Sequence, residues 1–233
     1  MPSKYFKQMQ HPDPYFSVPS VIAPAPWELS GSGYVFLFTN SRSFLTKHAF
    51  MSPYQEANLK SGIGAVMLVD YLSSPVGPYR ELLYIPGVFK LSGHYVFSIS
   101  KIYVSSMNSQ WNGVENWGIP KEVADFAIEQ VNEKEEEWTV SRNNKAFFSA
   151  SMSKGGLKFP VSTSLFPLRI GQQQKDSLLI TEPAAKGKGQ LIKSTHWHAD
   201  PHFFPSCEDS TFLLSLAIND FKMTFPPART FPV

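Results

Sequence analysis

Runs rich in β-branched and aromatic residues follow one another along the chain and are separated by turn-forming residues. These runs are Val35–Phe38, Ile63–Leu72, Glu81–Phe89, His94–Val104, Ala146–Met152, Gly156–Val161 and Thr211–Thr224. Gly, Pro, Asn or Ser residues bound them, and this combination predicts strands. Residues 95–104 partly alternate between apolar and polar side chains, as a strand with one solvated face does. The hydrophobic pattern therefore predicts a β-rich protein.

The prolines lie mostly between these runs, where they mark the ends of strands and do not interrupt them. Residues 1–26 carry prolines at positions 2, 12, 14, 19, 24 and 26, which predicts an extended arm along the surface. The sequence has no internal repeat and no linker-like stretch that would divide it. We therefore expect a single domain over residues 1–233, a size that is ordinary for one β-rich domain.

The segment that begins at Pro120 is ambiguous. A proline at a first helical position, followed by apolar Val123, Phe126, Ala127 and Val131, fits a helical stripe. A strand is the alternative, and the pattern by itself does not choose between the two.

Composition narrows the class of protein. The chain of 233 residues is 42% hydrophobic and 14% aromatic, which is enough for a large core. A net charge of +2 gives no indication of nucleic acid or an anionic membrane as a partner. The single Cys207 excludes an internal disulfide framework, and a buried, unreactive thiol is its expected state. No apolar run approaches the ~18 residues of a membrane span, so we expect a cytoplasmic protein.

One lysine is a candidate nucleophile. Lys121 ends the run Gly113-Val114-Glu115-Asn116-Trp117-Gly118-Ile119-Pro120-Lys121. Pro120 has a fixed φ and biases the residue before it toward extended geometry, so the lysine leaves the backbone in a defined direction. A lysine acts as a nucleophile near neutral pH only when its pKa falls by about 3 units, roughly 4–5 kcal/mol, and desolvation can supply this. The alternative is a solvated lysine in a Pro-Lys-Glu sequence that opens a helix.

Several short motifs occur in the order in which one enzyme family carries them. They are Gly77-Pro78-Tyr79-Arg80-Glu81, then Gly113-x-Glu115 with Gly118-x-Pro120-Lys121, then residues 219–228. They resemble the G-x-Y-x-E segment, the active-site run and the closing strand of the acetoacetate decarboxylase family. With Tyr34–Phe38 as the first strand, the resemblance covers roughly residues 26–231.

The resemblance implies a mainly β fold of the α+β class. Its antiparallel sheets would curve into a barrel or cone with a few short helices, and a central cavity would hold Lys121. It favours a brief helical turn near Lys121 followed by a strand. The acidic run Glu133–Glu137 then becomes a solvated hairpin turn.

The same resemblance implies a role for two residues in catalysis. Lys121 aligns with the lysine that adds to a ketone and loses water to give an iminium, which accepts the electrons of the bond to a β-carboxylate. Glu81 would position the acid and move protons, and its alternative is a surface ion pair with Arg80. The implied function is a Schiff-base lyase that decarboxylates a β-keto acid without a cofactor. Its partner would be a small-molecule keto substrate, and the family allows a homo-oligomer.

Three further residues would support the pocket. By the resemblance, Glu115 would brace the lysine loop through hydrogen bonds, and Trp117 and Tyr79 would line the pocket. Trp117 and its neighbours would supply the desolvation that tunes Lys121.

The chain departs from the family pattern at two positions. Glu122 replaces a second lysine beside Lys121, and the sequence leaves open whether its carboxylate faces Lys121. Ser32 stands where the family carries an arginine near the substrate end of the pocket. Because a small anionic substrate would lose that partner, we expect a bulkier, specialised-metabolism keto substrate rather than acetoacetate.

Two other functions remain open. The same iminium could serve dehydration, aldol or cyclisation chemistry. A protein of this scaffold could also bind a small molecule without catalysis, and the changes at Ser32 and Glu122 keep that reading open.

Three histidines suggest a metal site as a further alternative. His196 and His198 would share one face of a strand, and His202 could complete a zinc triad. A polar loop at the pocket mouth explains them better, because Asp200 is the only nearby carboxylate in the sequence. We expect no metal.

Overall fold

The structure, a computed structural model, describes residues 19–165, 167–207 and 210–233. The strands are β1 Trp27–Thr39, β2 Leu59–Ser61, β3 Ile63–Ser73, β4 Tyr79–Ile85, β5 Val88–Leu91, β6 His94–Phe97, β7 Lys101–Val104, β8 Lys121–Val123, β9 Asp125–Gln130, β10 Glu135–Arg142, β11 Lys145–Ser162, β12 Ile170–Gln174, β13 Ser177–Thr181, β14 Ala184–Ala199, β15 Thr211–Phe225 and β16 Arg229–Pro232. The helices are α1 Arg42–His48, α2 Pro53–Asn58 and α3 Met107–Trp117. The predicted mainly β fold with few short helices is confirmed.

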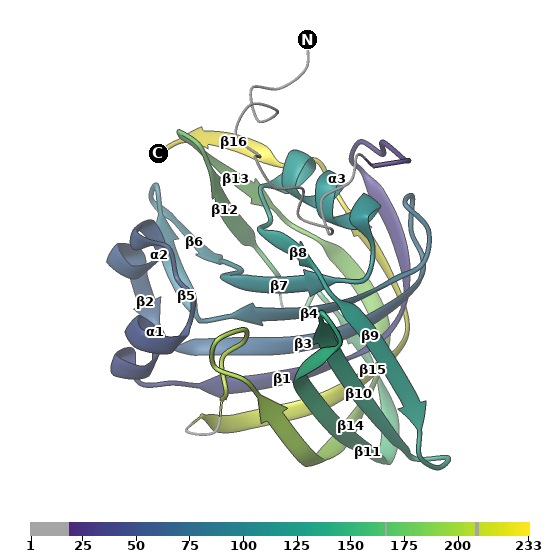
Figure 1. The fold of residues 1–233 in the computed structure, drawn as a ribbon. Helices are drawn as coiled ribbons and strands as arrows, with labels where there is room; N and C mark the ends of the chain where they lie inside the picture. Colours follow the sequence, from purple (N-terminus) through teal and green to yellow (C-terminus); the bar gives the residue numbers. More distant parts are fainter. Residues whose placement is uncertain (1–18, 166, 208–209) are drawn as a thin grey trace.

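The larger sheet curls on itself. Its ten strands follow the order β8-β7-β4-β3-β1-β15-β14-β11-β10-β9. The two edge strands, β8 and β9, are consecutive in the chain and are separated only by Ala124. The sheet must therefore bend until its edges approach each other, and Figure 1 shows this curled sheet with β9 and β10 crossing in front of the middle strands. Arg80 of β4 also reaches β9, where its Nη1 donates to the Phe126 carbonyl at 3.3 Å.

Alternation along the strands divides the buried side chains between the two faces of this sheet. On β4, Leu82 and Tyr84 point to the inner face, whereas Glu81 and Leu83 point to the outer face. The inner face is filled by a large aromatic core that includes Tyr34, Phe36, Phe38, Tyr103, Trp138, Phe147, Phe148 and Phe204. The inside of the curled sheet is therefore a packed core, and the candidate site lies on the outer face.

A second sheet covers part of that outer face. Its six strands follow the order β16-β13-β12-β6-β5-β2, and β12 pairs in parallel with β6. Ile170 of β12 packs with Leu83 of β4 and Ile102 of β7 in a second buried cluster. Helix α3 lies beside this cluster, so the site forms where the two sheets and α3 meet (Figure 1).

The segment before β1 is tied to α3. Of the predicted arm, residues 1–18 lie outside the described residues. Further along, Ser20 N donates to Asn108 Oδ1 at 2.8 Å, and Ala23 N donates to Asn112 Oδ1 at 2.8 Å. Asn116 Nδ2 donates to the Ala23 carbonyl at 2.9 Å. These side-chain amides, one helical turn apart, hold the segment along α3.

Two predicted strands are each divided in the structure. The run Glu81–Phe89 is broken at Gly87, where a Cβ would lie 1.9 Å from the Ser61 carbonyl oxygen. This close approach of two backbones separates β4 from β5, which lie in different sheets. The run His94–Val104 likewise divides into β6 and β7, again in different sheets. The alternation pattern could not reveal that the chain changes sheet at these points.

Other predicted strands merge or shift. The runs 146–152 and 156–161 form one strand, β11, with an irregular pairing between Lys154 and Lys158. The segment after Lys121 is extended, as the family resemblance favoured, and forms β8 and β9 rather than a helix. The hairpin turn lies at residues 131–134, whereas Glu135–Glu137 already belong to β10.

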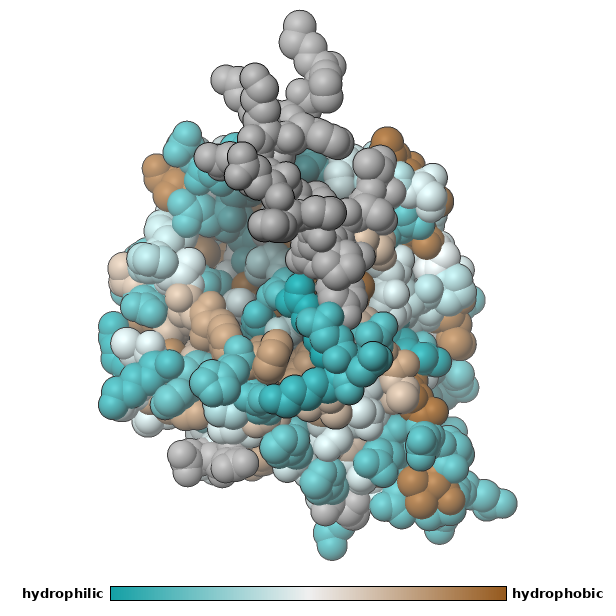
Figure 2. All heavy atoms as spheres, in the orientation of Figure 1, coloured by the Kyte–Doolittle hydropathy of each residue, from teal (hydrophilic) through white to brown (hydrophobic). Residues whose placement is uncertain are grey.

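The surface has no single hydrophobic face in the view of Figure 1. Figure 2 shows hydrophobic residues scattered among hydrophilic ones on that side. Within the described residues, no helix has the length and apolar character needed to cross a membrane.

Candidate active site

Lys121 begins strand β8, directly after the turn made by Pro120. Its backbone N–H donates to the Ile119 carbonyl across that turn at 2.8 Å. Parallel pairing with β7 places Lys121 opposite Ile102. The side chain is buried, and it runs from the sheet edge toward α3.

The glycines of the lysine motif have separate structural roles. Gly118 ends α3 with φ +66°, and its N–H donates to the Val114 carbonyl at 2.9 Å. A left-handed cap of this kind favours glycine. Gly113 faces the lysine, because an added Cβ would lie 2.7 Å from Lys121 Cδ. The motif therefore combines a helix end with the space through which the lysine side chain passes.

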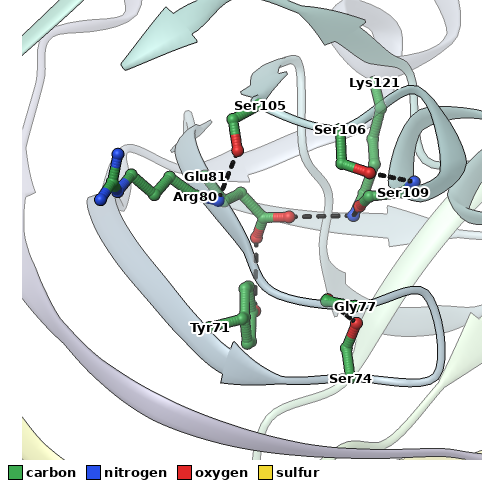
Figure 3. Close-up of polar contacts among 9 residues, drawn as sticks. All are labelled: Tyr71, Ser74, Gly77, Arg80, Glu81, Ser105, Ser106, Ser109 and Lys121. Atoms are coloured by element: carbon green, nitrogen blue, oxygen red, sulfur yellow. Dashed lines mark hydrogen bonds and ion pairs between the residues drawn. The ribbon is translucent and has the colours of Figure 1, made fainter. Parts of the chain in front are cut away.

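The Lys121 amine forms a buried ion pair with Glu81. Its Nζ lies 2.9 Å from Glu81 Oε2, and each side chain is 5% exposed. The amine also donates to Ser109 Oγ at 3.1 Å, and Tyr71 Oη donates to the other carboxylate oxygen of Glu81 at 3.5 Å. Figure 3 shows Glu81 between Tyr71 and Lys121, with Ser109 of α3 next to the amine. Glu81 is thus part of the site and is not a surface partner of Arg80, which pairs with Asp70 at 3.4 Å.

Tyr79 completes the surroundings of the amine. Its ring centroid lies 5.1 Å from Lys121 Nζ and 4.6 Å from the centroid of Tyr71. Burial, opposed in part by the Lys121 ammonium, raises the pKa of Tyr79 to about 12. Burial and the Glu81 carboxylate raise the pKa of Tyr71 well above its usual value. Both tyrosines therefore remain protonated hydrogen-bond donors at neutral pH.

Two opposing causes act on the pKa of Lys121. Burial lowers it, but the Glu81 carboxylate and the Tyr79 hydroxyl outweigh burial, so the pKa of Lys121 is raised. The desolvation that was expected to tune Lys121 is thus opposed by its charged partner Glu81. The resting state is an ammonium held by a carboxylate, and any neutral amine must arise by proton transfer out of this pair.

A small cavity of about 80 Å³ adjoins the ion pair. Its lining is mostly apolar and comprises Trp27, Leu29, Met67, Val69, Tyr71, Tyr79, Glu81, Leu83, Ile85, Ile99, Ile102, Trp117, Ile119, Lys121, Leu168, Ile170, Pro183, Met223 and Phe225. Among these described residues Lys121 is the only cation. A molecule in this cavity would lie against one amine in an otherwise apolar space.

Trp117 forms one wall of the cavity and is held rigidly. Its Nε1 donates to the Pro226 carbonyl at 2.8 Å, and its ring makes edge contacts with Trp27 at 5.0 Å and Phe225 at 4.6 Å. The structure therefore brings Lys121, Glu81, Tyr79 and Trp117 to one cavity, and their roles there stay a prediction.

Glu115 is not at this place. It is exposed on α3, and its carboxylate makes no hydrogen bond or ion pair with another described residue, so the predicted bracing of the lysine loop is wrong. Glu115 lies two positions from both Gly113 and Trp117, and this spacing puts it on the opposite side of a helix. The predictions also missed Tyr71 and Ser109. Ser109 lies one turn after the capping Ser106, a start signal from which α3 could have been predicted.

Ser32 also lies away from the lysine cavity. It pairs with Asp70 on β3, on the inner face of the sheet, and lines a separate cavity of about 50 Å³ with Tyr34 and Glu136. Its neighbour Gly31 pairs instead with Tyr71, and a Cβ there would lie 2.1 Å from the Asp70 carbonyl oxygen. The predicted place of Ser32 in the substrate pocket is therefore wrong, because one step along a strand reverses the face.

The direction of Glu122 is now clear. Its carboxylate oxygens lie 2.5 Å from Lys101 Nζ and 3.0 Å from Arg142 Nη1. Alternation along β8 turns Glu122 away from Lys121. Glu122, which stands in place of the family's second lysine, therefore puts no carboxylate next to the Lys121 amine.

Two of the three histidines, His196 and His198, belong to a strand rather than to a loop at the pocket mouth, whereas His202 is exposed in the turn after that strand. His196 and His198 are exposed on β14, and neither lines the cavity. His196 Nε2 lies 3.1 Å from Ser149 Oγ. Within the described residues, no group of three or more His, Cys, Asp or Glu could hold a metal ion. Cys207 is buried, and this burial raises the pKa of its thiol to about 12.

A wider groove adjoins the cavity. It has a volume of about 740 Å³ and is lined by Glu28, Tyr95, Ser162, Thr163, Ser164, Pro167, Leu168, Arg169, Glu182, Pro183, Ala184, Ala185, Lys186, Lys222, Met223 and Thr224. Leu168, Pro183 and Met223 line both spaces. The groove is thus continuous with the outer side of the lysine cavity.

The fold and the site together define a class: a curled β protein with a buried lysine–glutamate pair at an apolar cavity. The family model of acetoacetate decarboxylase (ADC) matches residues 50–175, more than half of the chain. The chain therefore belongs to the acetoacetate decarboxylase family. No curated protein sequence matches it.

Solved structures share the fold at low sequence identity. Acetoacetate decarboxylase from Legionella pneumophila subsp. pneumophila str. Philadelphia 1 is 14% identical, with a TM-score of 0.67 and 94% of each chain covered. An acetoacetate decarboxylase-like enzyme from Sphingomonas wittichii RW1 is 10% identical, with a TM-score of 0.64, covering 94% of this chain and 98% of that one. The enduracididine biosynthesis enzyme MppR, solved with the condensation product of pyruvate and imidazole 4-carboxaldehyde, is 13% identical, with a TM-score of 0.61 and 91% of each chain covered.

Proposed function

We propose that this protein is a Schiff-base lyase that decarboxylates a β-keto acid, with Lys121 as nucleophile and Glu81 as proton carrier. One observation supports this above all: the buried pair of Lys121 and Glu81, 2.9 Å apart, faces an apolar cavity. A lysine that served only stability would gain little from this position, because removing two charges from water costs several kcal/mol per ion, of order 5. Strongly perturbed charged groups in a cavity are typical of functional sites.

The pair can supply a neutral amine without exchanging a proton with solvent. Transfer from the Lys121 ammonium to Glu81 converts two buried charges into two neutral groups, a change that an apolar surrounding favours. The amine then attacks the ketone carbon. The Glu81 proton passes to the carbinolamine oxygen, water leaves, and an iminium forms beside the regenerated carboxylate.

The iminium accepts the electron pair of the bond to the carboxylate carbon. CO₂ leaves, an enamine forms, and protonation of its carbon followed by hydrolysis releases the ketone and the free lysine. The apolar lining favours this step, because the leaving carboxylate loses water of hydration in the cavity and its charge spreads as CO₂ departs.

The dimensions of the two spaces indicate how a large substrate would lie. A dry cavity of about 150 Å³ holds benzene in another protein, whereas the space beside Lys121 is about 80 Å³. Only the reacting keto end of a substrate fits there without movement of side chains. The remainder of a bulky substrate would occupy the adjoining groove of about 740 Å³.

A Schiff-base condensation is the second candidate function. It draws support from MppR, whose solved structure contains a condensation product of pyruvate and an aldehyde on a similar fold. If this protein catalysed such a condensation, an enamine on Lys121 would attack an aldehyde and no CO₂ would be released. A non-catalytic binding protein remains the third candidate, and it predicts no covalent intermediate.

Borohydride trapping tests the proposal. With a β-keto acid and borohydride, the wild-type protein should gain the mass of one reduced ketone adduct, located on the peptide that contains Lys121. Lys121→Ala should gain none, while Lys90→Met, which removes an exposed lysine of β5, should react as the wild type does. The absence of any adduct with a panel of keto acids would contradict the proposal. Adducts without CO₂ release would favour condensation.

A further inference from the structure

Ser109 is a polar residue that the fold buries beside the Lys121 amine. It is 0% exposed and lies in the first turn of α3, where its backbone N–H donates to the capping Ser106 Oγ at 3.3 Å. A buried hydroxyl costs free energy unless it is hydrogen-bonded. The Lys121 amine provides such a bond, since it donates to Ser109 Oγ at 3.1 Å. This contact joins the lysine to a residue twelve positions earlier, outside the motif that contains the lysine.

One face of α3 follows the lysine side chain along its length. Gly113 lies one turn after Ser109, and residues four apart share a helix face. A Cβ at Gly113 would lie 2.7 Å from Lys121 Cδ and 2.8 Å from Lys121 Cε, so the aliphatic part of the side chain passes the helix at this glycine. The amine lies next to Ser109. The same helix face therefore provides space for the stem and a hydrogen-bond acceptor for its charged end.

The amine has three polar partners, one for each N–H of an ammonium. Glu81 Oε2 lies at 2.9 Å, Ser109 Oγ lies at 3.1 Å, and the Tyr79 hydroxyl is the third. Ser109 also hydrogen-bonds with Tyr79, which engages its proton and leaves its oxygen as an acceptor for the amine. Glu81 and Tyr79 line the cavity, whereas Ser109 does not. Figure 3 shows Glu81 and Ser109 on different sides of the amine. Ser109 is thus the partner that lies outside the cavity.

A neutral amine must be oriented before it can attack a ketone. It carries two N–H groups and one lone pair, and the lone pair must point to the ketone carbon. An N–H that is held by an acceptor outside the cavity turns the rest of the amine toward the cavity. The iminium that follows has a single N–H, which lies in the plane of the C=N bond. When Ser109 accepts that N–H, Glu81 stays free to take up and release protons.

We propose that Ser109 is a positioning residue for Lys121. Its hydroxyl holds one N–H outside the cavity in the ammonium, the neutral amine and the iminium, so that the reacting lone pair faces the substrate. The inference rests on the proposed function and adds a residue on which the rate of iminium formation depends. Because Ser109 does not line the cavity, it acts through the lysine and not on the substrate.

The variants Ser109→Ala and Ser109→Thr test this role, because only the second keeps the hydroxyl. Borohydride trapping of a β-keto acid on Lys121 would be timed for each protein at its own optimal pH, so that a shift in the pKa of Lys121 cannot explain a difference. Ser109→Ala should trap about 10–100-fold more slowly, as expected for a misplaced reacting group. Ser109→Thr should keep most of the wild-type rate. In steady state, Ser109→Ala should lower kcat and leave KM nearly unchanged, since position 109 is outside the cavity lining.

The matched control is Ser98→Ala. Ser98 is 1% exposed, its hydroxyl donates to Gln172 Oε1 at 2.9 Å, and it does not line the cavity. Because both alanine variants remove a buried hydroxyl, both should have a lower melting temperature. Only Ser109→Ala should slow trapping and move its pH profile to lower pH, because the Lys121 ammonium then loses one hydrogen-bond acceptor.

Trapping by Ser109→Ala at the wild-type rate would overturn the role of Ser109 and leave the lyase intact. Equal slowing in Ser98→Ala would do the same, because it would trace the loss to general destabilisation. A threonine variant that melts with the wild type but traps as slowly as alanine would also overturn the role. Where the added methyl group lowers the melting temperature, Ser109→Cys replaces threonine, and its weakly accepting sulfur should give an intermediate rate. The absence of any adduct on Lys121 in the wild-type protein would refute the lyase and the role of Ser109 together.

Discussion

At the residue scale, the Lys121 amine is governed by its partner more than by its burial. Burial lowers the pKa of Lys121, and Glu81 with Tyr79 raises it above the usual value. Because the folded pKa is raised, the stability that this group contributes is present below the pKa of an unfolded lysine. It is lost as the pH rises through the folded value. Reactivity must therefore come from proton movement within the pair.

Replacement of Glu81 by Gln tests this account. Without the carboxylate, burial remains as the main influence, so the pKa of Lys121 should fall and the amine should be neutral at lower pH. Turnover should drop by about 10²–10⁴-fold, since the proton carrier is lost. Borohydride trapping should persist at a reduced rate, because Glu81 no longer gives its proton to the carbinolamine oxygen, and its pH profile should shift to lower pH than in the wild type. Unchanged turnover and an unchanged pH profile of trapping would contradict this account.

Alkaline titration offers a second test at the residue scale. Burial raises the pKa of Tyr79 to about 12, so the folded protein resists its ionisation. The stability associated with Tyr79 is complete below about pH 10, the usual tyrosine pKa, and it decreases as the pH approaches 12. Ultraviolet titration of the wild type should show late ionisation, and Tyr79→Phe should remove one tyrosine from that late step. An unchanged late step would place the ring of Tyr79 in contact with solvent.

At the scale of elements, helix α3 and strand β8 are joined by the short segment from Gly118 to Pro120, and together they surround the Lys121 side chain. The helix supplies Ser109 to the amine, ends at a left-handed glycine, and presents Gly113 to the lysine side chain. The sequence motif was visible, but the helix before it was not predicted. Its apolar positions do not form a clean stripe, since the buried residues of α3 include Ser109 and Asn112. Polar burial of this kind depends on partners that only the fold supplies.

Gly113→Ala tests the helix–lysine contact. A methyl group would lie 2.7 Å from Lys121 Cδ, so the lysine must move away from Glu81 and Ser109. Alanine stabilises a helix by up to ~1 kcal/mol relative to glycine, and this gain opposes the cost of displacing the lysine. The free energy of unfolding should therefore change little. The rate of iminium trapping should fall by about 10²-fold, as expected for a misplaced reacting group. Gly155→Ala is the control, since a Cβ at that position meets no atom within 4 Å.

At the scale of the whole molecule, the curled sheet brings its edges together through charged contacts. Glu122 of the edge strand β8 forms an ion pair with Lys101 of the neighbouring strand β7. It also pairs with Arg142 of β10, which lies next to the other edge of the ten-stranded sheet. The pocket is built against the outer face of this curled sheet. The expectation of a single domain over residues 1–233 stays a prediction, and one cooperative unfolding transition would support it.

Glu122→Lys, which restores the residue of the family pattern, should destabilise the protein rather than activate it. The change removes two partly exposed ion pairs, worth about 0.2–1 kcal/mol each, and places a third cation beside Lys101 and Arg142. Thermal unfolding should show a lower melting temperature. The pH dependence of trapping on Lys121 should stay the same, because position 122 faces away from the cavity. Faster trapping at neutral pH would indicate that the new lysine reaches the amine.

The sequence by itself determined the β-rich class, because strand alternation is a local property of the chain. The family resemblance of its short motifs predicted that Glu81, Tyr79 and Trp117 lie with Lys121 in one region. Only the tertiary structure decided which face of each strand meets which neighbour. A single step along β1 moves Ser32 to the inner core, and helical periodicity turns Glu115 to solvent. Ser109 of α3 accepts a hydrogen bond from the Lys121 amine, and Tyr71 of β3 donates one to Glu81. Such contacts join residues far apart in the chain, so strand register and sheet curvature create them, and no local pattern encodes them.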